Sequence, residues 1–329
     1  MIVEQLVEEG AIFIMVSVRE TFCKMKVTEL DQIVRMFELK VPCRKKDNII
    51  DIIYEYMKNN INNIFREFIV YEELNLLRKI CDNNFKILCK DVELDSDNVH
   101  SLLCIGIIYI EKTNIIIPKE FQNLIKSCLD DKYIIEFSKK REDIISIVQN
   151  LLELYGVFHL ELLEDYIIDK IGRGYRVHKI IEFIRKYNMR NNFYYEDEDC
   201  FYYNLKITDR PSMKMKIIEI NLRYKYFHES EMTDIINRES HYEKDIKIIL
   251  NRIYKNLKAS KQIIKVIKFM IIEGRTSEEI GGFIKEKVKR LSEFGFRSIV
   301  KSVDNMRKHY VIWGFKGYSL EEIDKKIMA

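Results

Sequence analysis

The sequence predicts a mainly α-helical protein that carries short β-hairpins and ends in a helical array. Apolar residues recur at helical spacing along most of the 329 residues, a pattern that favours amphipathic helices. The 11 glycines and 3 prolines are too few for a loop-rich β fold. Two clusters of β-branched or aromatic residues interrupt the helical pattern, and each predicts a hairpin.

Composition indicates folded domains with buried cores. Hydrophobic residues make up 47% of the chain and charged residues 33%, which is ordinary for a folded soluble protein. The seven cysteines form no CxxC pair and their number is odd. We therefore expect reduced thiols and a cytoplasmic protein without a membrane span. The order of predicted elements gives four domains: 1–62, an N-terminal helix plus a helix–loop–helix module; 63–135 and 136–210, two winged-helix-like units; and 211–329, a C-terminal helical domain.

The first domain should begin with a helix over Met1–Phe22. Leu30, Ile33 and Phe37 then recur at helical spacing, and Val41-Pro42 breaks this helix. A second short helix should start near Ile49 and end near residue 58. Three consecutive cations lie in the connection and at the start of the second helix: Arg44, Lys45 and Lys46.

The stretch VTELDQIVRMFELKVPCRKKDNIIDII resembles the SAP and Rho N-terminal helix-extension-helix modules. Leu30, Leu39, Lys46, Ile49 and Ile53 match positions of that pattern, whereas Glu38 and Arg44 stand where the family usually has glycine. The resemblance implies that the basic loop and the second helix contact a nucleic-acid backbone.

Two hairpins follow predicted helices. Residues 106–111 and 114–118 are β-branched runs separated by Lys112-Thr113. A second hairpin should join 193–195 to 200–203 through the acidic turn Glu196–Asp199. Carboxylates at a wing would repel phosphate. We therefore expect this turn to be solvated, structural or in contact with a protein.

From Pro211 onward the pattern is almost continuously helical. Part of this region, 304–307 and 313–323, is similar to the segment that precedes the zinc motif in Firmicutes SEC-C-containing proteins, although the cysteine-rich motif itself is absent. The resemblance implies a bacterial protein of similar architecture, and the zinc role of the missing motif does not carry over to this chain. The expected helices are 214–227, 229–239, 243–273, 277–293 and 296–313, with a last short one from 319.

A basic stripe is the most suggestive feature of the C-terminal region. Between Lys247 and Lys268 there are seven cations and no acid. Spacings of three, four and three place four lysines on one helical face: Lys258, Lys261, Lys265 and Lys268. Such a stripe could follow a phosphate backbone. It could also be a solvated face paired with acids of a neighbouring helix.

Motifs for other activities are absent or loose. The six histidines give no HExxH or paired CxxC pattern, so we expect no metal and no cofactor. A loose Arg-x4–6-His pattern of helical RNases occurs at Arg173–His178 and Arg223–His228.

The leading hypothesis is a non-enzymatic protein that binds DNA or RNA through the backbone, with little sequence specificity. The expected contacts are Arg44, Lys45, Lys46 and the four lysines of the stripe. A protein-interaction scaffold is the first alternative, and a helical RNase that uses Arg223 and His228 is the second.

Overall fold

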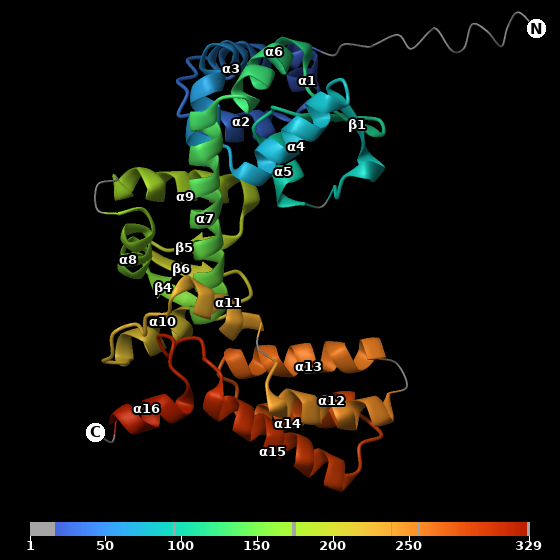
Figure 1. The fold of residues 1–329 in the computed structure, drawn as a ribbon, viewed down its shortest axis with the longest axis vertical. Coiled ribbons are helices and arrows are strands. Elements are labelled where there is room, and N and C mark those ends of the chain that lie inside the picture. Colours follow the sequence, from blue (N-terminus) through green and yellow to red (C-terminus); the bar gives the residue numbers. More distant parts are fainter. Residues whose placement is uncertain (1–16, 95, 173–175, 238, 255–256, 328–329) are drawn as a thin grey trace, which may run out of the picture. The chain divides into compact units, whose positions relative to one another are not determined.

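The chain is mainly helical, as predicted, and its strands form two small antiparallel sheets within the described residues. Figure 1 shows the order of these elements. Apolar side chains at helical spacing explain most helices, because each buries one stripe. A computed structural model describes residues 17–94, 96–172, 176–237, 239–254 and 257–327.

The chain forms two compact units, which are called unit 1 and unit 2 below. Their limits differ from the four predicted domains. The predicted boundary at 62/63 falls inside helix α3 (Lys46–Phe68), and residues on both sides of it share one hydrophobic core. The predicted boundary at 135/136 falls inside α7 (Lys132–Tyr155). Unit 1 comprises Met1–Ile145 and His178–Asn192, and unit 2 comprises Ser146–Val177 and Phe193–Ala329.

Unit 1 begins with three helices. The Ser17 hydroxyl caps α1 (Val18–Lys24) by accepting a hydrogen bond from the Glu20 N–H group, and the Glu20 carboxylate accepts one from the Ser17 N–H group. Most of the predicted helix Met1–Phe22 lies outside the described residues. Helix α2 (Val27–Met36) follows. The prediction that the next helix ends near residue 58 was wrong. Helix α3 continues to Phe68 because its buried apolar stripe continues through Ile61, Ile64 and Phe65.

The first hairpin is confirmed. Strand β3 lies in the centre of its sheet, in the order β1-β3-β2, and Tyr109 of β2 pairs with Ile116 of β3. Lys112 takes a positive φ of 53° in the connecting turn. The elements of this region are α4 (Tyr71–Asp82), β1 (Lys86–Leu88), the 3-10 helix η1 (Cys89–Asp91), α5 (Asp97–Cys104), β2 (Tyr109–Glu111), β3 (Asn114–Ile116) and α6 (Lys119–Leu129).

The second hairpin is confirmed as well, and its sheet has the order β4-β6-β5. Helix α7, which precedes this sheet, already begins at Lys132, and apolar residues such as Ile134 belong to its buried stripe. The element order from α7 onward is helix, strand, two helices and hairpin. The remaining elements are β4 (Val157–His159), α8 (Leu160–Ile171), α9 (Val177–Asn191), β5 (Tyr194–Glu196) and β6 (Phe201–Asn204).

The turn after α7 packs against the only tryptophan of the sequence. Gly156 has φ +68°, and a Cβ atom at this position would lie 2.2 Å from Cγ of Trp313. The indole N–H group donates a 3.0 Å hydrogen bond to the Glu153 carbonyl. Trp313 therefore lies in a turn of the buried core, and the expected helix over 296–313 ends earlier, at His309.

Other helix predictions in unit 2 were also too long; the helix expected over 277–293 ends at Lys287, as α14 (Ser277–Lys287). The helix expected over 214–227 is α10 (Arg210–Glu219), and residues 221–228 run without helix so that Lys225 and Phe227 can accept tyrosine hydroxyl bonds. The segment 243–273 forms two helices. From α11 onward the helices are α11 (Glu229–Asn237), α12 (His241–Ile253), α13 (Leu257–Ile272), α14 (Ser277–Lys287), α15 (Glu293–His309) and α16 (Leu320–Ile327).

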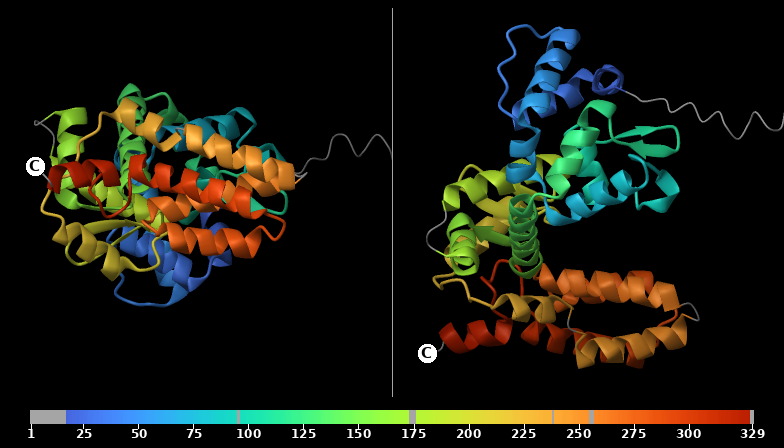
Figure 2. Two further views of the ribbon diagram at one scale, coloured as in Figure 1. Left: turned by 90° about the horizontal axis from the view of Figure 1, so that it is seen from below. Right: turned by 45° about the horizontal axis from the view of Figure 1, so that its top comes forward.

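Helices α12 to α15 form a helical array with its own hydrophobic core, which contains Leu250, Ile264, Ile284 and Ile299. The orange to red helices of Figures 1 and 2 show them side by side. Successive helices run in opposite directions. As a result, the ends of α12 and α14 lie beside the starts of α13 and α15.

Candidate nucleic-acid interface

The N-terminal cations lie at the start of α3. Arg44 and Lys45 are exposed in the connection from α2. Lys46 is the first residue of α3, and its ammonium group donates a 2.7 Å hydrogen bond to the Cys23 carbonyl at the end of α1. Lys46 therefore helps to hold α1 against α3, whereas Arg44 and Lys45 are the two cations of this segment that face solvent.

The predicted lysine stripe lies on α13. Lys258, Lys261 and Lys265 are exposed, and Ile264 and Ile267 are buried on the opposite face, as the spacing predicted. The fourth member, Lys268, is half-buried. Its Nζ lies 3.6 Å from Glu243 of α12 and 5.6 Å from the centre of the Tyr310 ring.

The predicted acidic partner on a neighbouring helix thus exists for Lys268. Burial raises the pKa of Tyr310 to about 12, so this ring stays neutral beside the ammonium group. Lys268 is held between α12 and α15, and the exposed part of the stripe consists of the three lysines before it.

A basic surface lies at the end of the array at which α12 and α14 finish and α13 and α15 begin. The Tyr254 hydroxyl donates a 2.8 Å hydrogen bond to the Lys287 carbonyl and so joins these ends. We call residues 250–254, 257–262 and 284–297 the basic tip. It contains eight cations and two carboxylates, a net charge of +6, whereas the whole chain carries +3. The cations are Arg252, Lys258, Lys261, Lys285, Lys287, Lys289, Arg290 and Arg297.

Each of the two carboxylates of the tip pairs with a cation of its own helix or turn. Glu286 lies 2.7 Å from Lys287, and Glu293 lies 3.2 Å from Arg297. Lys289 and Arg290 form the exposed turn between α14 and α15. Like charges gathered in one place repel each other and favour an anionic partner. The tip is therefore the strongest candidate for phosphate contact among the described residues.

Sequence reasoning missed most of this surface. The cationic run without acids ends at Lys268, and Glu286 and Glu293 interrupt the later run KEKVKRLSEFGFR. The sequence does contain a sign of this surface, namely five cations within 285–297. The antiparallel order of the helices was needed to place this run beside Lys258 and Lys261.

The acidic hairpin turn binds a cation of its own unit. Asp197 accepts a hydrogen bond from the Tyr203 hydroxyl, and its carboxylate lies 2.7 Å from Nζ of Lys214 on α10. Asp199 lies 2.5 Å from the same ammonium group. Partial burial opposes ionisation, but these bonds hold the pKa of Asp197 below its usual value. The turn therefore stabilises the packing of α10 on the hairpin.

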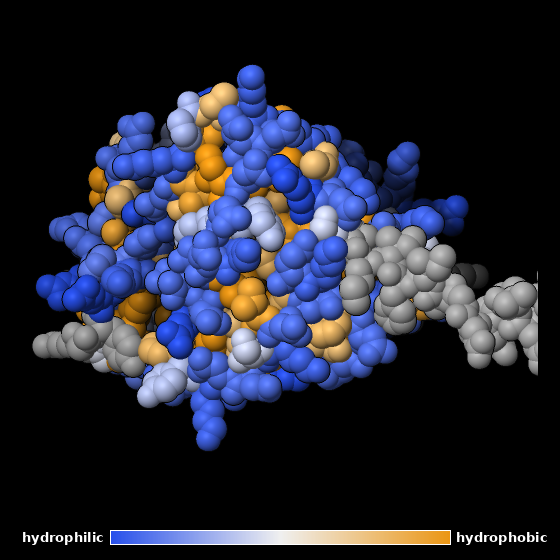
Figure 3. Space-filling view, turned by 90° about the horizontal axis from the view of Figure 1, so that it is seen from above, coloured by the Kyte–Doolittle hydropathy of each residue, from blue (hydrophilic) through white to orange (hydrophobic). Residues whose placement is uncertain are grey.

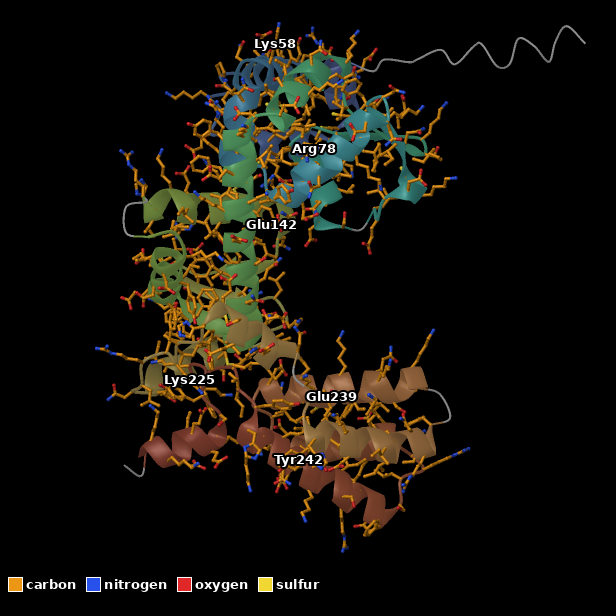
Figure 4. The ribbon with its side chains drawn as sticks, in the orientation of Figure 1. Lys58, Arg78, Glu142, Lys225, Glu239 and Tyr242 are labelled. Atoms are coloured by element: carbon orange, nitrogen blue, oxygen red, sulfur yellow. The ribbon has the colours of Figure 1, made fainter. Side chains whose placement is uncertain are left out.

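A cleft of about 600 Å³ lies between α11, α12, α15 and α16. Figure 4 labels three of its residues, Lys225, Glu239 and Tyr242. Its charges are largely paired: Lys225 lies 2.6 Å from Glu322, and Glu239 lies 3.1 Å from Lys247. This cleft lacks the surplus of one charge that makes the tip distinctive.

The RNase alternative has no assembled site in the described residues. Arg223 and His228 both lie exposed in the non-helical segment before α11. Arg173 of the other pair lies outside the described residues. Within the described part of the chain, no group of three or more His, Cys, Asp or Glu side chains is arranged to hold a metal ion.

Comparison with protein-family models, with curated protein sequences and with solved structures finds no match to this chain. The SAP-like and SEC-C-type resemblances therefore stay predictions. None of the helices in the described ranges combines the length and the apolar character needed to cross a bilayer.

Proposed function

We propose that the protein binds nucleic acid through backbone phosphates, with the basic tip of the helical array as the principal contact surface. The observation that carries the proposal is the net charge of +6 on three short segments brought together by the fold of α12 to α15. Each cation that neutralises a phosphate releases counterions, and this release drives sequence-independent binding.

The distribution of charge supports a defined surface. Outside the tip the rest of the chain sums to −3, because the whole carries +3. Figure 3 shows one face of the molecule, on which hydrophilic residues predominate and apolar residues lie among them, as is normal on a protein surface. Anions should therefore be drawn to the tip in preference to other surfaces.

The exposed pair Arg44 and Lys45 is the second candidate contact, as the SAP-like resemblance implies. The two cations are part of unit 1, and the tip is part of unit 2. We propose that this pair adds affinity and does not replace the tip, since it offers two exposed cations where the tip offers many more.

Fluorescence anisotropy with labelled single-stranded and duplex oligonucleotides tests the proposal. The dissociation constant is measured at several salt concentrations between about 50 and 200 mM. The double variant Lys289→Glu/Arg290→Glu should weaken binding at least tenfold. It should also reduce the slope of log affinity against log salt by about 1.4 on single strands, because two phosphate contacts are lost.

A matched control reverses two exposed cations of unit 1, Lys58 and Lys90. Lys58→Glu/Lys90→Glu changes the total charge equally and should leave affinity within about twofold. The variant Arg44→Glu/Lys45→Glu measures the second contact. It leaves the hydrogen bond from Lys46 to the Cys23 carbonyl intact. Equal losses in the tip variant and the unit 1 control, or no salt-sensitive binding by the original chain, would refute the proposal.

A further inference from the structure

Phe294, in the first turn of α15, is the most exposed large hydrophobic residue in the described parts of the chain, with 82% of its surface accessible. It lies within the basic tip, four positions after Arg290 and three before Arg297. Residues three apart on a helix share a face, so the ring and the Arg297 side chain are neighbours.

The fold itself does not use this ring. The buried face of α15 contains Gly295, Ile299, Val303 and Met306. Phe294 precedes Gly295 by one position, which turns its side chain about 100° away from that face.

Gly295, the residue that follows Phe294, occupies the inward-facing position of this helix turn. A Cβ atom at Gly295 would lie 2.8 Å from Leu291 and 3.7 Å from Ile249 of α12. The helix start therefore packs closely against α12 and the preceding turn through a glycine, while phenylalanine occupies the outer side.

A second phenylalanine provides the contrast. Phe296 packs against the core of the array, and the Lys285 ammonium group lies 4.6 Å from its ring centre. In the sequence EFGF, the ring of Phe296 therefore packs on the core and the ring of Phe294 faces solvent. An exposed ring among cations offers a flat face for another π system, with charges available for the phosphates on either side.

Resting on the proposed function, we infer that the basic tip binds single-stranded nucleic acid, with an unpaired base stacked on Phe294 and adjacent phosphates held by Lys289, Arg290 and Arg297. Bases in a duplex are already stacked on each other and present no free face to the ring. Duplex should therefore be bound by the cations alone.

A lipid surface is the other anionic partner that an exposed ring and cations could meet. Anchoring in a bilayer requires a wide apolar face or several apolar side chains. Leu291, the nearest apolar residue in the turn, is only half-exposed. One ring suits one base, which favours nucleic acid over a membrane.

The test compares Phe294→Ala with the original chain on a single strand, on a duplex of the same sequence and on an abasic strand of equal length. We expect Phe294→Ala to lose roughly 5- to 150-fold in affinity for the single strand. Affinity for the duplex and for the abasic strand should change less than about twofold, because those contacts are electrostatic. Strands of DNA and of RNA are both measured.

Tyr133→Ala is the matched control, since Tyr133 is an aromatic residue that is 69% exposed in unit 1. It should leave affinity for the single strand unchanged. Phe294→Trp should preserve binding, and its new indole emission should be quenched by the single strand. Trp313 is 2% exposed and gives a constant background.

The failures of the two proposals are distinguishable. If Lys289→Glu/Arg290→Glu loses salt-sensitive binding but Phe294→Ala binds the single strand as the original chain does, the stacking inference is overturned and the proposed function stands. If the original chain binds no oligonucleotide, both fail. Binding only to vesicles of phosphatidylserine and phosphatidylcholine, lost in Phe294→Ala, would assign the tip to membranes and overturn the inference.

Discussion

Arg190, near the end of α9, and Glu73, in the first turn of α4, form an ion pair that is closed to solvent. Nη1 of Arg190 lies 3.3 Å from Oε1 of Glu73, and both side chains are 0% exposed. Glu73 also accepts hydrogen bonds from the Val70 N–H group and the Ser101 hydroxyl, and Arg190 donates to the Phe68 carbonyl. This network fixes α9 in unit 1, although its two charged residues are 117 positions apart.

Removal of one partner of this pair should be costly. Arg190→Met leaves the carboxylate of Glu73 buried without its counter-charge, and we expect a loss of about 3–5 kcal/mol in the free energy of unfolding. The double variant Arg190→Met/Glu73→Gln should recover part of this loss, because glutamine carries no charge: its amide oxygen can accept the Val70 N–H bond, and its amide N–H group can donate to the Ser101 hydroxyl oxygen.

Urea unfolding followed by circular dichroism measures both variants. Arg19→Met is the control, since Arg19 pairs with Asp51 at the surface, where the two side chains are 63% and 51% exposed. Its effect should stay within about 1 kcal/mol. If Arg190→Met destabilises the protein no more than this control, the buried pair does not have the role assigned to it.

Gly156 should be intolerant of any side chain. Gly156→Ala places a methyl group on the Trp313 ring and adds the strain of a positive φ. We expect lower stability and a red-shifted emission from Trp313, which reports its own displacement because it is the only tryptophan.

Two other glycines separate the effect of the steric contact from the effect of the positive φ. Gly172→Ala has a positive φ with no atom within 4 Å of the new Cβ, and Gly282→Ala has neither strain nor contact. Gly172→Ala should cost about 1–3 kcal/mol, because φ 82° with ψ 159° is a backbone conformation that alanine rarely adopts. Gly282→Ala should stabilise α14 by up to about 1 kcal/mol, since alanine favours helix. An unchanged emission spectrum in Gly156→Ala would contradict the packing described.

Acid should weaken unit 2 in part through Asp197. Its folded-state pKa is depressed, so the ion pair with Lys214 contributes stability above the unfolded pKa of about 3.9 and loses it as the pH falls through the folded value. Asp197→Asn should be about 1 kcal/mol less stable than the original chain near pH 7, and the difference should shrink towards pH 2. Urea unfolding at each pH gives the comparison. A difference that is constant with pH would exclude this contribution.

Thiol reactivity should follow burial. Cys23 and Cys43 are exposed, whereas Cys81 and Cys128 are buried and burial raises the pKa of each thiol to about 11. A thiol reagent should label Cys23 and Cys43 first and reach Cys81 and Cys128 only on unfolding, because the thiolate is the reactive form. The variant Cys23→Ser/Cys43→Ser should remove the fast phase. Early labelling of Cys81, detected by mass spectrometry of peptides, would contradict the core of unit 1.

Local pattern was sufficient for the fold class. Helices and hairpins depend on the spacing of apolar residues within a few turns, and both hairpins form where the β-branched and aromatic runs predicted them. Helix ends were less well predicted. Segment 221–228 was expected to continue a helix, but it is not helical, and two of its carbonyl groups accept hydrogen bonds from tyrosine hydroxyls of distant residues.

The sequence by itself determined the mainly helical character, the two hairpins and the exposed lysines of α13. The tertiary structure alone decided that α9 belongs with the N-terminal residues, because the Arg190–Glu73 pair is visible only when distant segments meet. It also assembled the basic tip, since antiparallel packing brings the ends of four helices together and adds their charges in one place. Periodicity describes which face of a helix is buried, but not which other helix end will lie beside it.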